Sequence, residues 1–227
     1  MDDEFAEPEP GMRVGVQVAA ALVLTVAAVG VLWGLGVFSP KSGSGKPAVC
    51  SSTHDVLPPQ YASGAQLCAA LNRSDLPALL QTPTEQALNA SGSADWMTIG
   101  STKIAAPQAD VQLRTYSLQL SASYDDLPVA QSVPVLGSSA QARTVLGHPA
   151  VLYSDRTVAL SFSLGGGKAS SGPGGIARCL LVARSAKDGG GSFEIDLWRQ
   201  DDVLPDDAAL LRVAEQVLPT LPGWTVG

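Results

Sequence analysis

Two carboxylates and an indole occupy alternate positions of one predicted strand near the carboxyl end of the chain. Glu194, Asp196 and Trp198 are each two residues apart, and alternate residues of a β-strand point to the same face of a sheet. Paired carboxylates and aromatic rings line sites for carbohydrates or cations. The spacing makes these three residues candidates for a ligand-binding groove on this face. The expectation is the solvent-exposed face of an amphipathic strand, and the groove is its alternative.

The chain has two histidines, the side chains best suited to general acid–base catalysis near neutral pH. His54 lies in a polar segment, and His148 lies in the turn-like triplet Gly147-His148-Pro149. Neither is accompanied by a G-x-S-x-G nucleophile elbow or by an H-E-x-x-H metal motif. We therefore assign no catalytic residue, cofactor or metal ligand and expect both histidines to be solvated, while His148 joins Glu194, Asp196 and Trp198 as a candidate ligand-binding residue. A hydrolase that uses His148 or the Glu194/Asp196 pair is the alternative.

Three cysteines allow one intramolecular disulfide and leave at least one thiol free. A Cys50–Cys68 bridge would close a short loop, and loop entropy gives it a stabilising effect of roughly 3 kcal/mol. Cys179 lies in an apolar stretch and is typical of a buried core thiol. Bridges from Cys179 to either of the other cysteines stay open on this reasoning.

Composition excludes several classes of protein. Fourteen Lys and Arg against 21 Asp and Glu give a formal net charge of −7, which argues against nucleic-acid binding through a broad basic surface. The hydrophobic fraction of 45% is high enough for a packed core and excludes general disorder. Three Cys and two His are too few for a disulfide-dense scaffold or a Cys/His zinc cluster.

An uncharged apolar run extends over residues 14–38. As a helix it would be about 37 Å long, enough to cross a hydrocarbon core of about 30 Å. It is too long for the apolar core of a cleaved signal peptide, and no clean cleavage site follows. We predict an uncleaved transmembrane helix. Gly30 and Gly34 in this run have a spacing that allows close helix packing and a homodimer.

The predicted transmembrane helix divides the chain into four segments. Residues 1–13 form an acidic tail, 14–38 the transmembrane helix, 39–49 a Gly/Ser/Pro tether and 50–227 a single domain. A short tail before one span is the usual layout of a signal anchor. We therefore expect a cytoplasmic tail and an extracytoplasmic domain held at the cell membrane.

Hydrophobic periodicity predicts the elements of this domain. Short helices are expected after Ser63 and Ser74, and a longer one starts at Asp206. The alternation reverses phase near Thr115, which predicts one long strand with a bulge, whereas residues 89–107 read mostly as loop. The remaining strands are predicted over 143–146, 150–153, 158–164, 176–184 and 193–197, with a turn at 155–156 and a loop at 165–175.

Strands bracketed by helices predict an α+β fold. We expect an antiparallel sheet of five to seven strands, with helices packed on one face and one transmembrane helix before it.

Two stretches carry a resemblance to a known family: VLGHPAVLYSDRTVALSFSL over 145–164, and SFEIDLWRQDDVLPDDAALLRVAEQVLPTLPGW over 192–224. They resemble an uncharacterised actinobacterial domain-of-unknown-function family, and the likeness extends from Leu57 to Trp224. Its members have an acidic amino terminus, one membrane helix and an extracytoplasmic domain. LCAALNRSDLPALL over 67–80 is also similar to the opening of small actinobacterial envelope lipoproteins. The resemblance implies the location of the protein and its fold. It does not imply any particular activity.

These features predict a membrane-anchored cell-envelope protein with a non-catalytic extracytoplasmic binding or interaction domain. Its expected partners are the lipid bilayer, through residues 14–38, and an envelope ligand or protein. The alternatives are an envelope-associated hydrolase and a single-pass sensor.

Overall fold

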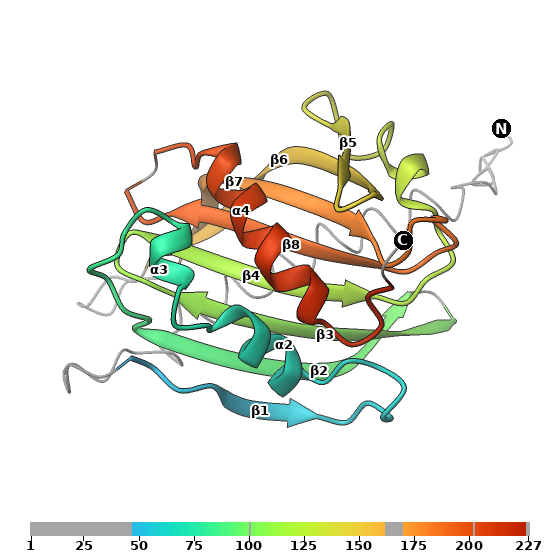
Figure 1. Cartoon of the computed structure of the whole chain (residues 1–227), viewed down its shortest axis with the longest axis horizontal. Coiled ribbons are helices and arrows are strands. Elements are labelled where there is room, and N and C mark those ends of the chain that lie inside the picture. The colour runs from blue at the N-terminus through green and yellow to red at the C-terminus, as the bar shows by residue number, and fades with distance from the viewer. Residues whose placement is uncertain (1–46, 100, 162–169, 202, 226–227) are drawn as a thin grey trace, which may run out of the picture.

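An eight-stranded sheet forms most of the molecule (Figure 1). The computed structural model describes residues 47–99, 101–161, 170–201 and 203–225. The strand order is β1-β2-β3-β4-β8-β7-β6-β5. β1 and β2 run parallel, whereas every other neighbouring pair is antiparallel, so the sheet is mixed.

The strands are β1 (Ser51–Asp55), β2 (Asn89–Ile99), β3 (Thr102–Gln112), β4 (Tyr116–Ser123), β5 (Gln141–Val145), β6 (His148–Ser161), β7 (Ser170–Ala183) and β8 (Ser192–Arg199). The helices are α2 (Gly64–Leu71), α3 (Leu76–Leu79) and α4 (Asp207–Val217), with 3₁₀ turns η1 (Val129–Ser132) and η2 (Leu218–Thr220).

The expected α+β fold is therefore wrong in its main features. The sheet has eight strands instead of five to seven, and its β1–β2 pair makes it mixed instead of antiparallel. The helices in the described part of the chain are few and short, and they cover only part of the sheet instead of forming a packed layer. Among the described residues no helix is long and apolar enough to cross a membrane. The run 14–38, with Gly30 and Gly34, lies outside those residues.

The additional strands come from a segment without clear periodicity. β2 and the first half of β3 are rich in Ala, Ser and Gly, so residues 89–107 read as loop although they form a regular antiparallel pair. The phase reversal near Thr115 marks a hairpin, not a bulge: Leu113 N donates to Tyr116 O at 2.8 Å between β3 and β4. β6 continues through 155–156, and β7 already begins at Ser170.

Local capping explains where the helices begin. Ser63 caps α2, as predicted from the sequence, and the structure adds Gln66 as the second member of a reciprocal capping box. Asp206 caps α4 by accepting from Ala208 N at 3.0 Å, also as predicted. Ser74 is not a cap, because α3 begins after Asp75.

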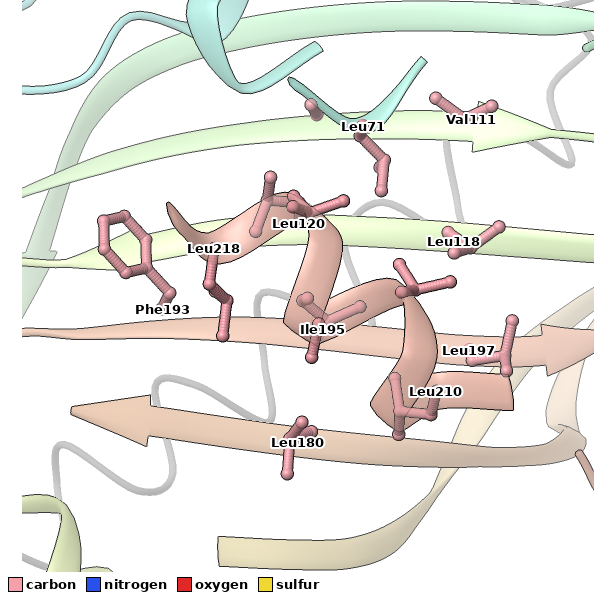
Figure 2. Packing of buried hydrophobic residues seen from close by; sticks show 14 of the residues in the cluster. Leu71, Val111, Leu118, Leu120, Leu180, Phe193, Ile195, Leu197, Leu210 and Leu218 are labelled. Carbon is pink, nitrogen blue, oxygen red and sulfur yellow. The ribbon is translucent and has the colours of Figure 1, made fainter. Parts of the chain in front are cut away.

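The main core lies between one face of the sheet and the apolar sides of α2 and α4. Figure 2 shows Leu210 and Leu218 above Leu180 of β7 and Ile195 of β8, with Leu71 of α2 nearby. Alternate residues of β8, which are Phe193, Ile195 and Leu197, face this core and are fully buried. The other residues of the strand must therefore face the opposite side of the sheet.

A second apolar cluster lies on that opposite side, over β6 and β7. Val129 of η1 and nearby Val133 and Leu136 pack against Val151 and Leu181. The carboxylate of Asp188 accepts from Val129 N at 2.7 Å and from Ala130 N at 2.9 Å, which holds η1 against the sheet.

Cys50 and Cys68 are joined by a disulfide, which ties the segment preceding β1 to α2. Cys179 is free and buried.

Candidate functional site

Five polar side chains form a line across the face of the sheet opposite α4. The strand registers place Asp110 opposite Gln119, Gln119 opposite Asp196, Asp196 opposite Cys179, and Cys179 opposite Tyr153. Directly opposed residues on neighbouring strands have Cβ atoms roughly 5 Å apart. We call these five residues the polar row; they come from β3, β4, β8, β7 and β6.

Glu194 lies beside the polar row, two residues before Asp196 on β8. The hydroxyl of Tyr153 donates a hydrogen bond to Glu194 Oε1, so the carboxylate bridges from β8 to β6. Trp198 lies two residues after Asp196 on the same face of β8 and is half-buried against the second apolar cluster. Glu194, Asp196 and Trp198 thus share one face, with the two carboxylates in its buried centre.

The three carboxyl groups of this site are buried. Asp110, Glu194 and Asp196 expose 6%, 4% and 1% of their surface, so the expectation of a solvent-exposed strand face is wrong for Glu194 and Asp196. Within the described part of the chain, the ion pairs join other residues, and no Lys or Arg lies in salt-bridge distance of these carboxyls. The cluster therefore has no internal cation to balance its charge.

Burial raises the pKa of all three carboxyl groups, because a charged carboxylate is poorly solvated inside the protein. The pKa of Asp110 rises to about 7. The pKa of Glu194 also rises to about 7 through burial, although the Tyr153 hydrogen bond lowers it in part. For Asp196, burial and the neighbouring Glu194 charge raise the pKa well above its usual value.

The two weakly acidic groups of the row are held protonated. Burial, followed by the charges of Asp196 and Glu194, raises the pKa of the Cys179 thiol well above its usual value. Burial and Glu194 raise the pKa of the Tyr153 hydroxyl in the same way. A thiolate is the nucleophilic form of cysteine, so neither group is an activated nucleophile here.

A small cavity opens on the same face beside Glu194. Its volume is about 30 Å³, and β2, β3, β4 and β8 all contribute to its wall. Its polar wall includes Glu194, Gln119, Gln108 and Ser121, and its apolar wall includes Met97 and Ile104.

Three buried polar atoms of the row have no hydrogen-bond partner among the described residues: Asp110 Oδ1, Gln119 Nε2 and Asp196 Oδ1. Buried polar groups in proteins are nearly always paired, and an unpaired one costs about 1–3 kcal/mol. Three such atoms on adjacent strands therefore indicate a place where an additional polar group would be stabilising.

His148 lies on the other side of the sheet, away from the polar row. It is the first residue of β6 and is fully buried, so the expectation of a solvated turn histidine is wrong for it. Leu146 and Gly147, both with positive φ, make the turn. The ring stacks on Trp224 with 3.8 Å between centroids, and Nδ1 lies 2.8 Å from Ala183 O.

This position separates His148 from the carboxylates. Its Nε2 has no partner among the described residues, and neither a serine hydroxyl nor a carboxylate contacts the ring there. His54 lies in β1, and its side chain is outside the description. In the described part of the chain no group of three His, Cys, Asp or Glu could hold a metal ion.

Sequence reasoning missed Asp110, Gln119 and Tyr153 as members of this site. Each sits in a strand with nothing unusual in its local pattern. The signal that could have found them is strand register, which pairs residues distant in the sequence.

Comparison with known proteins places the first part of the chain in a family. A family model described as "Family of unknown function (DUF6215)" matches residues 9–139, more than half of the chain. The match includes Asp110 and Gln119 and ends before Tyr153, Cys179 and β8. The stretches 145–164 and 192–224, on which the sequence resemblance was based, lie outside it. No curated protein and no solved structure matches the chain.

Proposed function

Because the chain belongs to the DUF6215 family of unknown function, we propose its function from the geometry of its sheet: a non-catalytic domain that binds a small ligand at the polar row beside Glu194. The single observation that carries this proposal is the set of buried, unpartnered polar atoms on three adjacent strands next to a cavity on the same face. Gln119 lines this cavity, so a ligand bound there would supply its missing hydrogen bond.

Binding accounts for this arrangement better than catalysis does. A hydrolase that used His148, Cys179 or Tyr153 would need an activated nucleophile or a base within reach of one. His148 lies on the opposite side of the sheet with no such partner among the described residues. The Cys179 thiol and the Tyr153 hydroxyl are both held in their protonated forms by burial.

We further propose that this domain is held at the outer surface of the cell membrane. The support comes from the sequence: residues 14–38 carry no charge and are long enough to cross the bilayer, and a Gly/Ser/Pro tether follows over 39–49. The Cys50–Cys68 disulfide agrees with an oxidising side of the membrane. The ligand would then be a component of the cell envelope or its surroundings.

Native mass spectrometry of the full-length chain, purified from its own membrane without ligand exchange, tests the binding function. The double variant Glu194→Gln/Asp196→Asn removes both charges while keeping side-chain size. Glu215→Gln is the matched control, because Glu215 is exposed on α4. We expect a small-molecule adduct on the wild type and on the control, and at least a tenfold loss of that adduct on the double variant.

An adduct of equal occupancy on all three proteins would contradict the proposal, and so would no adduct on any of them. Far-ultraviolet circular dichroism and the unfolding midpoint of each variant show whether it is folded before its occupancy is compared.

A further inference from the structure

The size of the cavity beside Glu194 restricts what can enter it. Its volume of about 30 Å³ is two to three times the roughly 10–15 Å³ that a cavity needs to hold one water molecule. An ammonium group is of similar size, whereas a sugar ring is several times larger. The buried part of a ligand is therefore a single small polar group, which disfavours a carbohydrate at this position.

The polar wall of the cavity consists of hydrogen-bond acceptors and groups that can become acceptors. Glu194 offers its carboxylate and Ser121 its hydroxyl oxygen. Gln108 Nε2 donates to Ser93 Oγ at 3.4 Å, which leaves the Gln108 carbonyl oxygen to accept. A half-turn of the Gln119 amide puts its oxygen where the unpartnered Nε2 lies, in a side chain that is only 3% exposed.

No basic side chain lines this cavity among the described residues. An ammonium group carries three donors and no acceptor, so it matches a wall of acceptors. It would also supply the positive charge that the buried carboxyl groups lack.

The apolar wall of the cavity indicates where the rest of the ligand would lie. Met97 of β2 lies directly opposite Ile104 of β3, and both are half-buried at the cavity. Ala106 follows Ile104 on the same face. An alkyl chain attached to the ammonium group would lie along these side chains.

We propose that the ligand of this site is a primary alkylammonium ion, with its ammonium group at Glu194 and Gln119 and its alkyl chain along Met97 and Ile104. This inference rests on the proposed function and gives its ligand class. A metal ion is a poor alternative, because no three metal-ligating side chains converge in the described part of the chain.

The proposal also makes binding dependent on pH. Glu194 interacts with Tyr153 and Asp155 of β6, with Cys179 of β7 and with Asp196 of β8, and Asp196 in turn interacts with Asp110 of β3. None of these is a cation. Since the pKa of Glu194 is about 7 in the free protein, most of its carboxyl is neutral at pH 6 and must lose its proton when a cation binds.

Isothermal titration of the full-length chain with n-butylammonium chloride tests the ligand class. We expect binding at pH 8, about tenfold weaker binding at pH 6, and release of close to one proton at pH 6, measured in two buffers of different ionisation enthalpy. Glu194→Gln should weaken binding at pH 8 at least tenfold, and Glu215→Gln should leave it unchanged.

Two further probes separate this inference from the proposed function. Tetramethylammonium has the same charge but no N–H donor and should not bind; equal binding of both ions would overturn the proposal. Binding of methyl glucoside at this face, lost in Glu194→Gln, with none of butylammonium, would overturn the ligand class and leave the proposed function in place. Absence of binding by every probe, with only water in the cavity, would overturn the ligand class, and the adduct experiment decides separately on the proposed function.

Discussion

At the scale of one residue, the buried carboxyl of Asp110 makes the free energy of unfolding depend on pH. Its carboxyl is buried, one of its oxygens has no partner among the described residues, and burial is the cause of its raised pKa. The folded protein keeps this proton up to a pH of about 7, whereas an unfolded chain loses it near 3.8. Between these values the folded state binds more protons, so the free energy of unfolding falls as the pH rises.

Asp110→Asn removes this effect, because an amide of the same size does not ionise. We expect the variant and the wild type to be equally stable near pH 3.5. The free energy of unfolding of the variant should then exceed that of the wild type by an amount that grows from about pH 4 to about pH 8, where it reaches a constant value of about 4 kcal/mol. Urea unfolding across this range measures it. A difference independent of pH would contradict the assigned cause.

At the scale of elements, the contact between α2 and β2 depends on two glycines. A Cβ atom on Gly92 would lie 2.0 Å from Gly64 O, and a Cβ atom on Gly64 would lie 2.3 Å from Ser93 N. The helix and the strand therefore touch backbone to backbone, which no other residue type permits. This approach sets how deeply Leu67 and Leu71 of α2 enter the main core.

Gly92→Ala should separate α2 from β2 and lower the free energy of unfolding by about 2–3 kcal/mol, the range for overpacking in a core. Gly189→Ala is the matched control, since nothing lies within 4 Å of its added methyl group. Thermal unfolding of both variants, followed by circular dichroism, compares them. Equal midpoints would show that the helix accommodates the methyl group without loss.

At the scale of the whole molecule, fractionation and cysteine labelling together test the cellular location of the domain and the Cys50–Cys68 disulfide. We expect the full-length chain to stay in the membrane fraction after alkaline extraction, as an uncharged run over 14–38 predicts. On intact cells, an impermeant maleimide should label the half-buried Cys50 only after reduction, whereas the fully buried Cys68 and Cys179 should react only after unfolding.

Extraction of the chain into the soluble fraction would contradict the membrane anchor. Labelling of Cys50 without reductant would contradict a domain on an oxidising side. Protection of Cys50 in reduced intact cells, with labelling of Cys50 once the membrane is opened, would place the domain inside instead.

The sequence by itself determined the features that depend on neighbouring residues. Ser63 and Asp206 cap helices because their side chains reach backbone N–H groups two or three residues away. Alternation along β8 placed Glu194 and Asp196 on one face because the period of a strand is two. The run over 176–184 is apolar on both faces, which predicted a central strand, and β7 indeed lies between β8 and β6.

Only the tertiary structure decided which strands are neighbours and in what register. Asp110 of β3 and Tyr153 of β6 belong to one row because β8, late in the chain, inserts between β4 and β7. The same pairing put His148 on the opposite side of the sheet from Glu194. Strand pairing joins segments far apart along the chain through packing and hydrogen bonds, and the local pattern of a single sequence carries no record of those partners.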